Sequence, residues 1–141
     1  MASATAGLVG GLVATVVMTG VMMVMGDGGP PPTAQLVAKF AGGGADDYAM
    51  PGMLLHFAYG IGAGAVFAVG APLIGLSLGS VLVAAGIGVV YGLLLMIVGM
   101  GFWLRTVIGM EADRDMMVMF GTVHVVYGAV LGGFVGAGFL A

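Results

Sequence analysis

Residues 78–101 read LGSVLVAAGIGVVYGLLLMIVGMG, and none of these side chains is charged. A helix rises about 1.5 Å per residue, so this stretch is long enough to cross a hydrocarbon core of about 30 Å. A charged residue at the centre of such a helix costs roughly 2.5–3.5 kcal/mol on insertion scales. Residues 5–25, 53–72 and 118–140 are also long, apolar and free of charge. The sequence therefore predicts four transmembrane helices.

Composition favours the same fold class. Of the 141 residues, 61% are hydrophobic and 6% are charged, whereas soluble domains carry about 25% charged residues. The predicted fold is all-α, a single integral membrane domain over residues 1–141 built as a four-helix bundle. The first apolar segment lacks both a Lys/Arg-rich start and a small-residue cleavage site. We therefore expect it to be retained as a helix, not removed as a signal peptide.

All three basic and all six acidic residues fall in two stretches, 26–50 and 102–117. Because the four helices alternate in direction, both stretches lie on one side of the membrane and both termini on the other. Lys39, Arg105 and Arg114 favour a cytoplasmic charged side in the plasma membrane, since cytoplasmic loops are enriched in Lys and Arg. The net charge of −3 argues against a nucleic-acid surface.

Each charged stretch contains a predicted short helix at the membrane surface. Thr33 is placed to cap a helix over residues 34–41, whose apolar side chains share one face. A second short helix is predicted within residues 106–117. Just before it, Trp103 and Arg105 form an aromatic and cationic pair that is typical of an anchor at headgroup level.

The second and fourth apolar segments share a motif. His56-x-x-Tyr59-Gly60-x-x-x-Gly64 recurs as His124-x-x-Tyr127-Gly128-x-x-x-Gly132. The chain has only two histidines and four tyrosines, so chance does not readily place both residue types in the same register. We interpret the chain as two related helical hairpins that form a parallel internal repeat.

Many glycines in these segments are four residues apart. This small-xxx-small spacing lets membrane helices approach closely, and helix packing is the predicted role of these positions: Gly60, Gly64, Gly88, Gly92, Gly128, Gly132 and Gly136.

His56 and His124 lie within about two turns of the charged side, so we expect them at the same depth on two helices. An ionisable residue at membrane depth is a functional candidate. The simpler interpretation is a neutral histidine bonded to a tyrosine, a loop carboxylate or a backbone carbonyl. The alternative is bis-His ligation of haem b. Tyr59 and Tyr127 would then lie beside the cofactor, and the three basic side chains would meet its propionates.

A second candidate ligand is Cu(I), which thioether and imidazole groups bind well. The chain has 13 methionines. Five of them lie towards the charged side, at about the depth of the histidines: Met18, Met22, Met25, Met96 and Met100. Methionine is also an ordinary packing residue, so ligation and packing both remain open.

No nucleophile–base spacing or phosphate-binding loop stands among the acidic residues, so we expect a protein that is not an enzyme. The leading hypothesis is an accessory or assembly subunit of a larger membrane complex, such as a respiratory one. Its expected partners are the lipid bilayer and other membrane subunits, or further copies of itself. A b-type haem electron carrier is the second hypothesis, and a protein that handles Cu(I) or another solute is the third.

Three segments carry a resemblance to known proteins. They are GDGGPPPTAQLVAKF (residues 26–40), HFAYG (56–60) and HVVYG (124–128). Together they resemble small four-helix membrane proteins of archaea, particularly halophiles. The resemblance implies a four-helix membrane bundle. Such families have no assigned chemistry, so it implies no site residue or cofactor.

Overall fold

The computed structural model describes residues 2–140, and over that range it consists of helices and their connections, without strands. In chain order the elements are α1 (Ala4–Met25), α2 (Pro32–Ala41), the 3-10 helix η1 (Ala45–Tyr48), α3 (Ala49–Leu73), α4 (Val81–Val98), the π-helix η2 (Gly99–Ile108) and α5 (Arg114–Gly136). The prediction of an all-α fold is confirmed for these residues.

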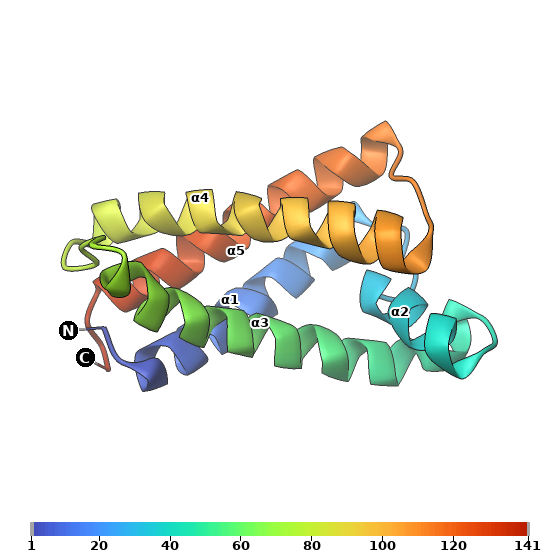
Figure 1. Cartoon of the computed structure of the whole chain (residues 1–141), viewed down its shortest axis with the longest axis horizontal. Helices are drawn as coiled ribbons and strands as arrows, with labels where there is room; N and C mark the ends of the chain where they lie inside the picture. Colours follow the sequence, from blue (N-terminus) through green and yellow to red (C-terminus); the bar gives the residue numbers. More distant parts are fainter. Residues whose placement is uncertain (1, 141) are drawn as a thin grey trace.

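The four long helices run side by side and alternate in direction (Figure 1). α1 packs against both α3 and α5, and α4 packs mainly against α5. α3 and α4, in contrast, have very little direct helix packing. The helices therefore form a row in the order α3, α1, α5, α4, and this row curves so that its two ends, α3 and α4, become neighbours. The contact between α3 and α4 is loosely packed, and we call it the α3–α4 seam.

Glycines explain the tight contacts within this row. A Cβ added at Gly11 of α1 would lie 2.7 Å from the carbonyl oxygen of Gly60 and 3.1 Å from the Cα of Gly64 on α3. On the other side of the row, a Cβ at Gly88 of α4 would meet the backbone of Gly128 on α5. Each pair of helices approaches so closely that the backbones touch.

The seven glycines named from the sequence all lie at such contacts. An added Cβ would meet α1 at Gly60 and Gly64, α5 at Gly88 and Gly92, and α4 at Gly128, Gly132 and Gly136.

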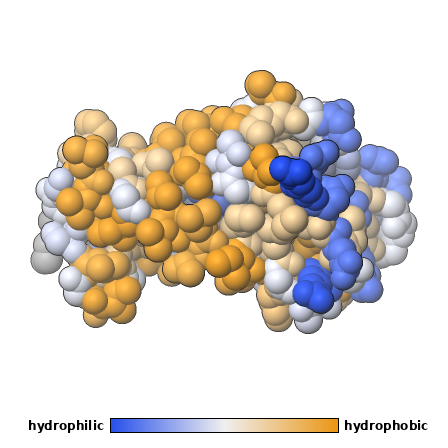
Figure 2. Space-filling model, turned by 90° about the horizontal axis from the view of Figure 1, so that it is seen from above, coloured by the Kyte–Doolittle hydropathy of each residue, from blue (hydrophilic) through white to orange (hydrophobic). Residues whose placement is uncertain are grey.

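Four helical spans are long and apolar enough to cross a membrane: α1, η1 with α3, α4 with η2, and α5. Large apolar side chains cover their outer faces; Leu82, for example, is 85% exposed. Hydrophilic residues gather at the end of the molecule that holds both charged stretches (Figure 2). Both termini lie at the other end, where the Ser3 hydroxyl donates a hydrogen bond to the Leu140 carbonyl at 2.8 Å. The surface is compatible with a multi-pass membrane protein.

The second charged stretch differs from its prediction. The third span does not end near residue 101 but continues as η2 to Ile108, where Gly109 adopts a positive φ of 82° and ends it. The separate short helix predicted within residues 106–117 is wrong. α5 already begins at Arg114, because the Asp113 carboxylate caps it by accepting from the Met116 N–H at 2.8 Å. It ends at Gly136, before the predicted residue 140.

The first charged stretch holds the expected short helix, α2, with a different cap. Pro31 occupies the N-cap position, and the Thr33 hydroxyl donates to the Gly52 carbonyl of α3 instead. Ala34 lies against Gly52, so α2 is pressed onto the start of α3. α2 also contacts η2, so it covers the charged end of the bundle.

Candidate functional site

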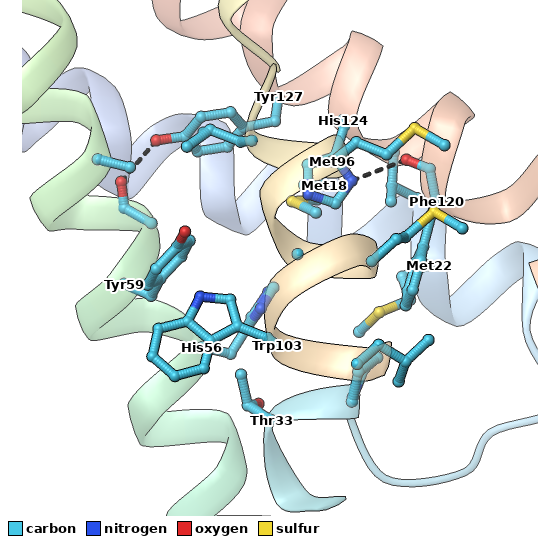
Figure 3. Close-up of a pocket in the computed structure, with 18 of the residues that line it drawn as sticks. Met18, Met22, Thr33, His56, Tyr59, Met96, Trp103, Phe120, His124 and Tyr127 are labelled. Carbon is cyan, nitrogen blue, oxygen red and sulfur yellow. Dashed lines mark hydrogen bonds between the residues drawn. The ribbon is translucent and has the colours of Figure 1, made fainter. Parts of the chain in front are cut away.

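A cavity of about 210 Å³ lies beside the α3–α4 seam, near the charged end of the bundle. α3 and α4–η2 form its walls, α1 and α5 its floor, and α2 closes the end (Figure 3). No charged side chain of the described residues lines it. Tyr59, which lines the wall from α3, is 43% exposed. The cavity is therefore partly open to the outside, and Tyr59 of α3 is one of its exposed lining residues.

Both histidines line this one cavity. The Nε2 atom of His56 lies 3.0 Å from the Thr19 hydroxyl oxygen of α1. That hydroxyl donates its single proton to the Thr15 carbonyl at 2.7 Å. With that proton directed at Thr15, the Thr19 oxygen accepts from His56, and on this basis we assign the imidazole proton to Nε2 and a lone pair to Nδ1.

His124 is fixed by the backbone of its own helix. Its Nδ1 atom lies 2.7 Å from the Phe120 carbonyl oxygen, one turn earlier in α5. A carbonyl oxygen can only accept, so Nδ1 carries the proton and Nε2 keeps the lone pair. The sequence had indicated a histidine bonded to a backbone carbonyl as the simpler interpretation, and His124 has that bond.

The other ring nitrogen of each histidine has no hydrogen-bond partner within the described chain. Over residues 2–140, no buried side-chain nitrogen or oxygen lacks a partner. These two nitrogens therefore keep some exposed surface, and both imidazole rings belong to residues that line the cavity.

The two candidate tyrosines have different positions. Tyr127 is 2% exposed, and its hydroxyl donates to the Gly60 carbonyl at 2.6 Å, which ties α5 to α3. The Tyr59 hydroxyl has no such bond within residues 2–140, and Tyr59 both lines the cavity and is partly exposed. Tyr59 can therefore contact a ligand through its hydroxyl, whereas Tyr127 contributes mainly its ring.

The π-helix adds residues that the sequence analysis missed. Trp103, predicted as a headgroup anchor, lines the cavity, as do Leu104 and Ile108. Gly99 and Ile108 are about 2.5 turns apart in an α-helix and would face opposite sides. In a π-helix the hydrogen bonds join residues i and i+5, so each turn holds more residues than an α-helical turn. The wider turn brings Gly99, Trp103, Leu104 and Ile108 to the side that lines the cavity, while Arg105 and Thr106 are exposed.

Four of the five methionines named from the sequence line the same cavity: Met18, Met22, Met96 and Met100. Met25 does not and is 46% exposed. Within residues 2–140 there is no cluster of three His, Cys, Asp or Glu side chains that could hold a metal ion. A copper ion here would depend on thioethers together with the two imidazoles.

The site does not fit haem b in this conformation. Its volume of about 210 Å³ is below the range of roughly 300–1,000 Å³ that is typical of pockets for drug-sized ligands. Haem is at least as large as such a ligand. Lys39, Arg105 and Arg114, which were expected to meet the propionates, do not line the cavity. The histidines are thus brought together without room for the macrocycle between them.

Over the residues described, the structure defines an all-helical protein with four potential membrane spans and a partly open cavity that is lined by uncharged side chains. Comparison with known proteins adds nothing to this description: no family model matches the chain, and no curated protein or solved structure matches it significantly.

Proposed function

We propose that this chain is a non-enzymatic membrane protein that binds a lipid-soluble small molecule in the cavity at the α3–α4 seam. The observation that carries the proposal is the combination of an apolar lining with a few accessible polar atoms, which is the usual composition of a small-molecule site. A hydrophobic cavity of about 150 Å³ binds benzene. At about 210 Å³, this one has room for one substituted ring.

The position of the opening favours a ligand that arrives from the bilayer. The seam is the loosely packed edge of the row, and the two helices that border it carry exposed apolar side chains such as Leu54 and Ile97. A molecule dissolved in lipid reaches the cavity sideways without crossing the charged end, which α2 covers. An apolar tail then remains in the lipid while the polar end lies between the histidines.

Extraction of the bound molecule tests this proposal. The protein is purified in mild detergent from its native membrane, and the solvent extract is analysed by mass spectrometry for a molecule present at about one per chain. Met22→Trp places a large side chain in the cavity. Met23→Trp is the matched control, because Met23 is 63% exposed and does not line the cavity.

We expect the wild-type protein and Met23→Trp to carry the molecule and Met22→Trp to lose it. Equal amounts of the molecule per chain in the extracts of all three proteins would refute the proposal. A reduced-minus-oxidised visible spectrum of the same samples tests haem directly, and a haem spectrum abolished by changing both histidines would restore the electron-carrier hypothesis.

The second candidate function is the accessory subunit. It is favoured by outward-facing glycines in the spans, at which an added Cβ would meet nothing within 4 Å: Gly62, Gly70, Gly86 and Gly133. These smooth positions suit packing against helices of another subunit or of a second copy. Gentle purification should then recover a partner, and Gly62→Leu together with Gly86→Leu should release it. Recovery of the same partner by this double variant would contradict that role.

We also propose that the two halves are a parallel repeat and that the charged end faces the cytoplasm. The repeat is supported by equivalent contacts: Gly11 meets Gly60 and Gly64, as Gly88 meets Gly128 and Gly132. The orientation is supported by the three basic residues, all of which lie in the charged stretches.

A further inference from the structure

We infer that the polar end of the ligand is a ring bearing hydroxyl groups, and that the cavity binds a hydroquinone in preference to the corresponding quinone. This inference rests on the proposed function, because it specifies the chemistry of the lipid-soluble molecule. Its basis is the state of the two imidazoles.

Each imidazole has one nitrogen fully engaged. Nε2 of His56 donates to Thr19, and Nδ1 of His124 donates to the Phe120 carbonyl. Both rings are neutral, because no carboxylate of the described residues lines the cavity to stabilise an imidazolium there. The remaining nitrogen of each ring, which is the one free to meet a ligand, is therefore an acceptor. Two acceptors require donors on the ligand.

A hydroquinone carries two O–H donors, whereas a quinone carries two carbonyl acceptors. Placed between the histidines, a quinone would direct the lone pairs of its carbonyl oxygens at the lone pairs of the imidazole nitrogens. These buried atoms would then lack hydrogen-bond partners, which lowers the affinity. The Trp103 N–H and the Tyr59 hydroxyl belong to residues that also line the cavity, and both can donate. They can bind a further substituent of the ring and do not replace the two imidazole acceptors.

The aromatic lining of the cavity favours a ligand with a flat ring over a linear alcohol. Aromatic rings of Tyr59, Trp103, Phe120 and Tyr127 contribute to its lining (Figure 3). Flat rings pack well against such side chains in offset or edge-to-face arrangements. A divalent cation is disfavoured, since no carboxylate of the described residues lines the cavity to balance its charge.

Isothermal titration of the purified protein in detergent tests the inference with three matched probes: decyl-hydroquinone, decyl-benzoquinone and decylbenzene. We expect the hydroquinone to bind about tenfold more tightly than the quinone, as one or two satisfied hydrogen bonds predict. His124→Phe keeps a ring of similar shape and should remove most of that preference while leaving decylbenzene binding unchanged.

A second pair of variants guards against a folding defect at His124. Thr19 is a positioning residue, since it acts through His56. Thr19→Val removes the acceptor that fixes the His56 tautomer and should reduce the preference for hydroquinone, whereas Thr19→Ser keeps the hydroxyl and should restore it. A purely structural role of Thr19 would lower the affinity for all three probes alike.

The outcomes separate this inference from the function on which it rests. Equal binding of the three probes, or tighter binding of the quinone, would overturn the hydroquinone inference and leave the lipid-soluble ligand standing. If none of the three probes binds, and Met22→Trp yields the same extracted molecules in the same amounts as the wild type, both the hydroquinone inference and the proposed function are overturned.

Discussion

The close contact between α1 and α3 leads to a quantitative prediction about Gly11. An alanine Cβ at this position would lie 2.7 Å from the Gly60 carbonyl oxygen and 3.1 Å from the Cα atoms of Ile61 and Gly64. Ordinary contact begins at 3.4 Å, so the helices must separate by about 0.7 Å. The opposing atoms are backbone, and no rotamer change can relieve the contact.

The cost follows from the packing that this separation removes. A gap of about 0.5–1 Å forfeits roughly a quarter to a half of each atom pair's attraction. Overpacking of this kind typically costs about 1–3 kcal/mol. Membrane helices have no hydrophobic drive towards one another, so little compensates for lost packing. Against this, alanine is favoured over glycine within a helix by about 0.8–1 kcal/mol.

Gly20→Ala, on the same helix, separates the two terms. An added Cβ at Gly20 meets nothing within 4 Å, so only the helix propensity changes and the variant should be neutral or more stable by up to about 1 kcal/mol. Gly11→Ala should then be less stable than Gly20→Ala by about 1–3 kcal/mol.

The free energy of unfolding can be measured by titrating dodecyl sulfate into detergent micelles and following the fluorescence of Trp103, the single tryptophan. Since both variants make the same chemical change in one helix, their difference isolates the contact with α3. A difference below about 0.5 kcal/mol would show that α1 and α3 are not in backbone contact, and the reasoning would fail.

Three further predictions concern other parts of the molecule. Tyr127→Phe removes the buried hydrogen bond between α5 and α3 and should cost about 1–2 kcal/mol of unfolding free energy in the same titration, with no change contradicting its role. Because the chain has no cysteine, the reaction of a single introduced cysteine with maleimide reports the accessibility of its position. Leu104→Cys, at a position 4% exposed, should react far more slowly than Thr106→Cys. Equal rates would refute the packing of η2. An impermeant maleimide applied to intact cells should label Gly75→Cys and spare Ala112→Cys, and the reverse pattern would show that the charged end is external.

The sequence predicted the four spans because an apolar segment of membrane length that carries no charge is rare outside a lipid-spanning helix. The prediction failed where a charged residue suggested the end of a helix. Arg105 is exposed, and a long basic side chain can reach the headgroups without ending the helix that carries it. The helix in fact ends at Gly109, whose φ is positive. This glycine is present in the sequence, but the charged residues near it suggested a different end for the helix.

The site was predictable only in part. Equal distance from the charged loops predicted that His56 and His124 share a depth in the membrane, which stays a prediction; the structure shows that both line one cavity. The partner of His56, however, is Thr19, and nothing in the local pattern joins these residues from two different helices. Trp103 and Ile108 were also out of reach, because their orientation depends on a π-helix that has no simple periodic signature.

The distribution of small and large side chains accounts for a cavity in so small a bundle. Where glycine faces glycine, as between α1 and α3 and between α4 and α5, the backbones touch and leave no space. At the α3–α4 seam, large side chains face each other: the rings of Phe67 and Tyr91 lie 5.2 Å apart, and the Tyr91 hydroxyl donates to the Ala63 carbonyl at 2.8 Å. These rings hold the two helices apart and join them at a single level. The space left between that level and α2 is the cavity, so the packing that stabilises the bundle also leaves room for a ligand.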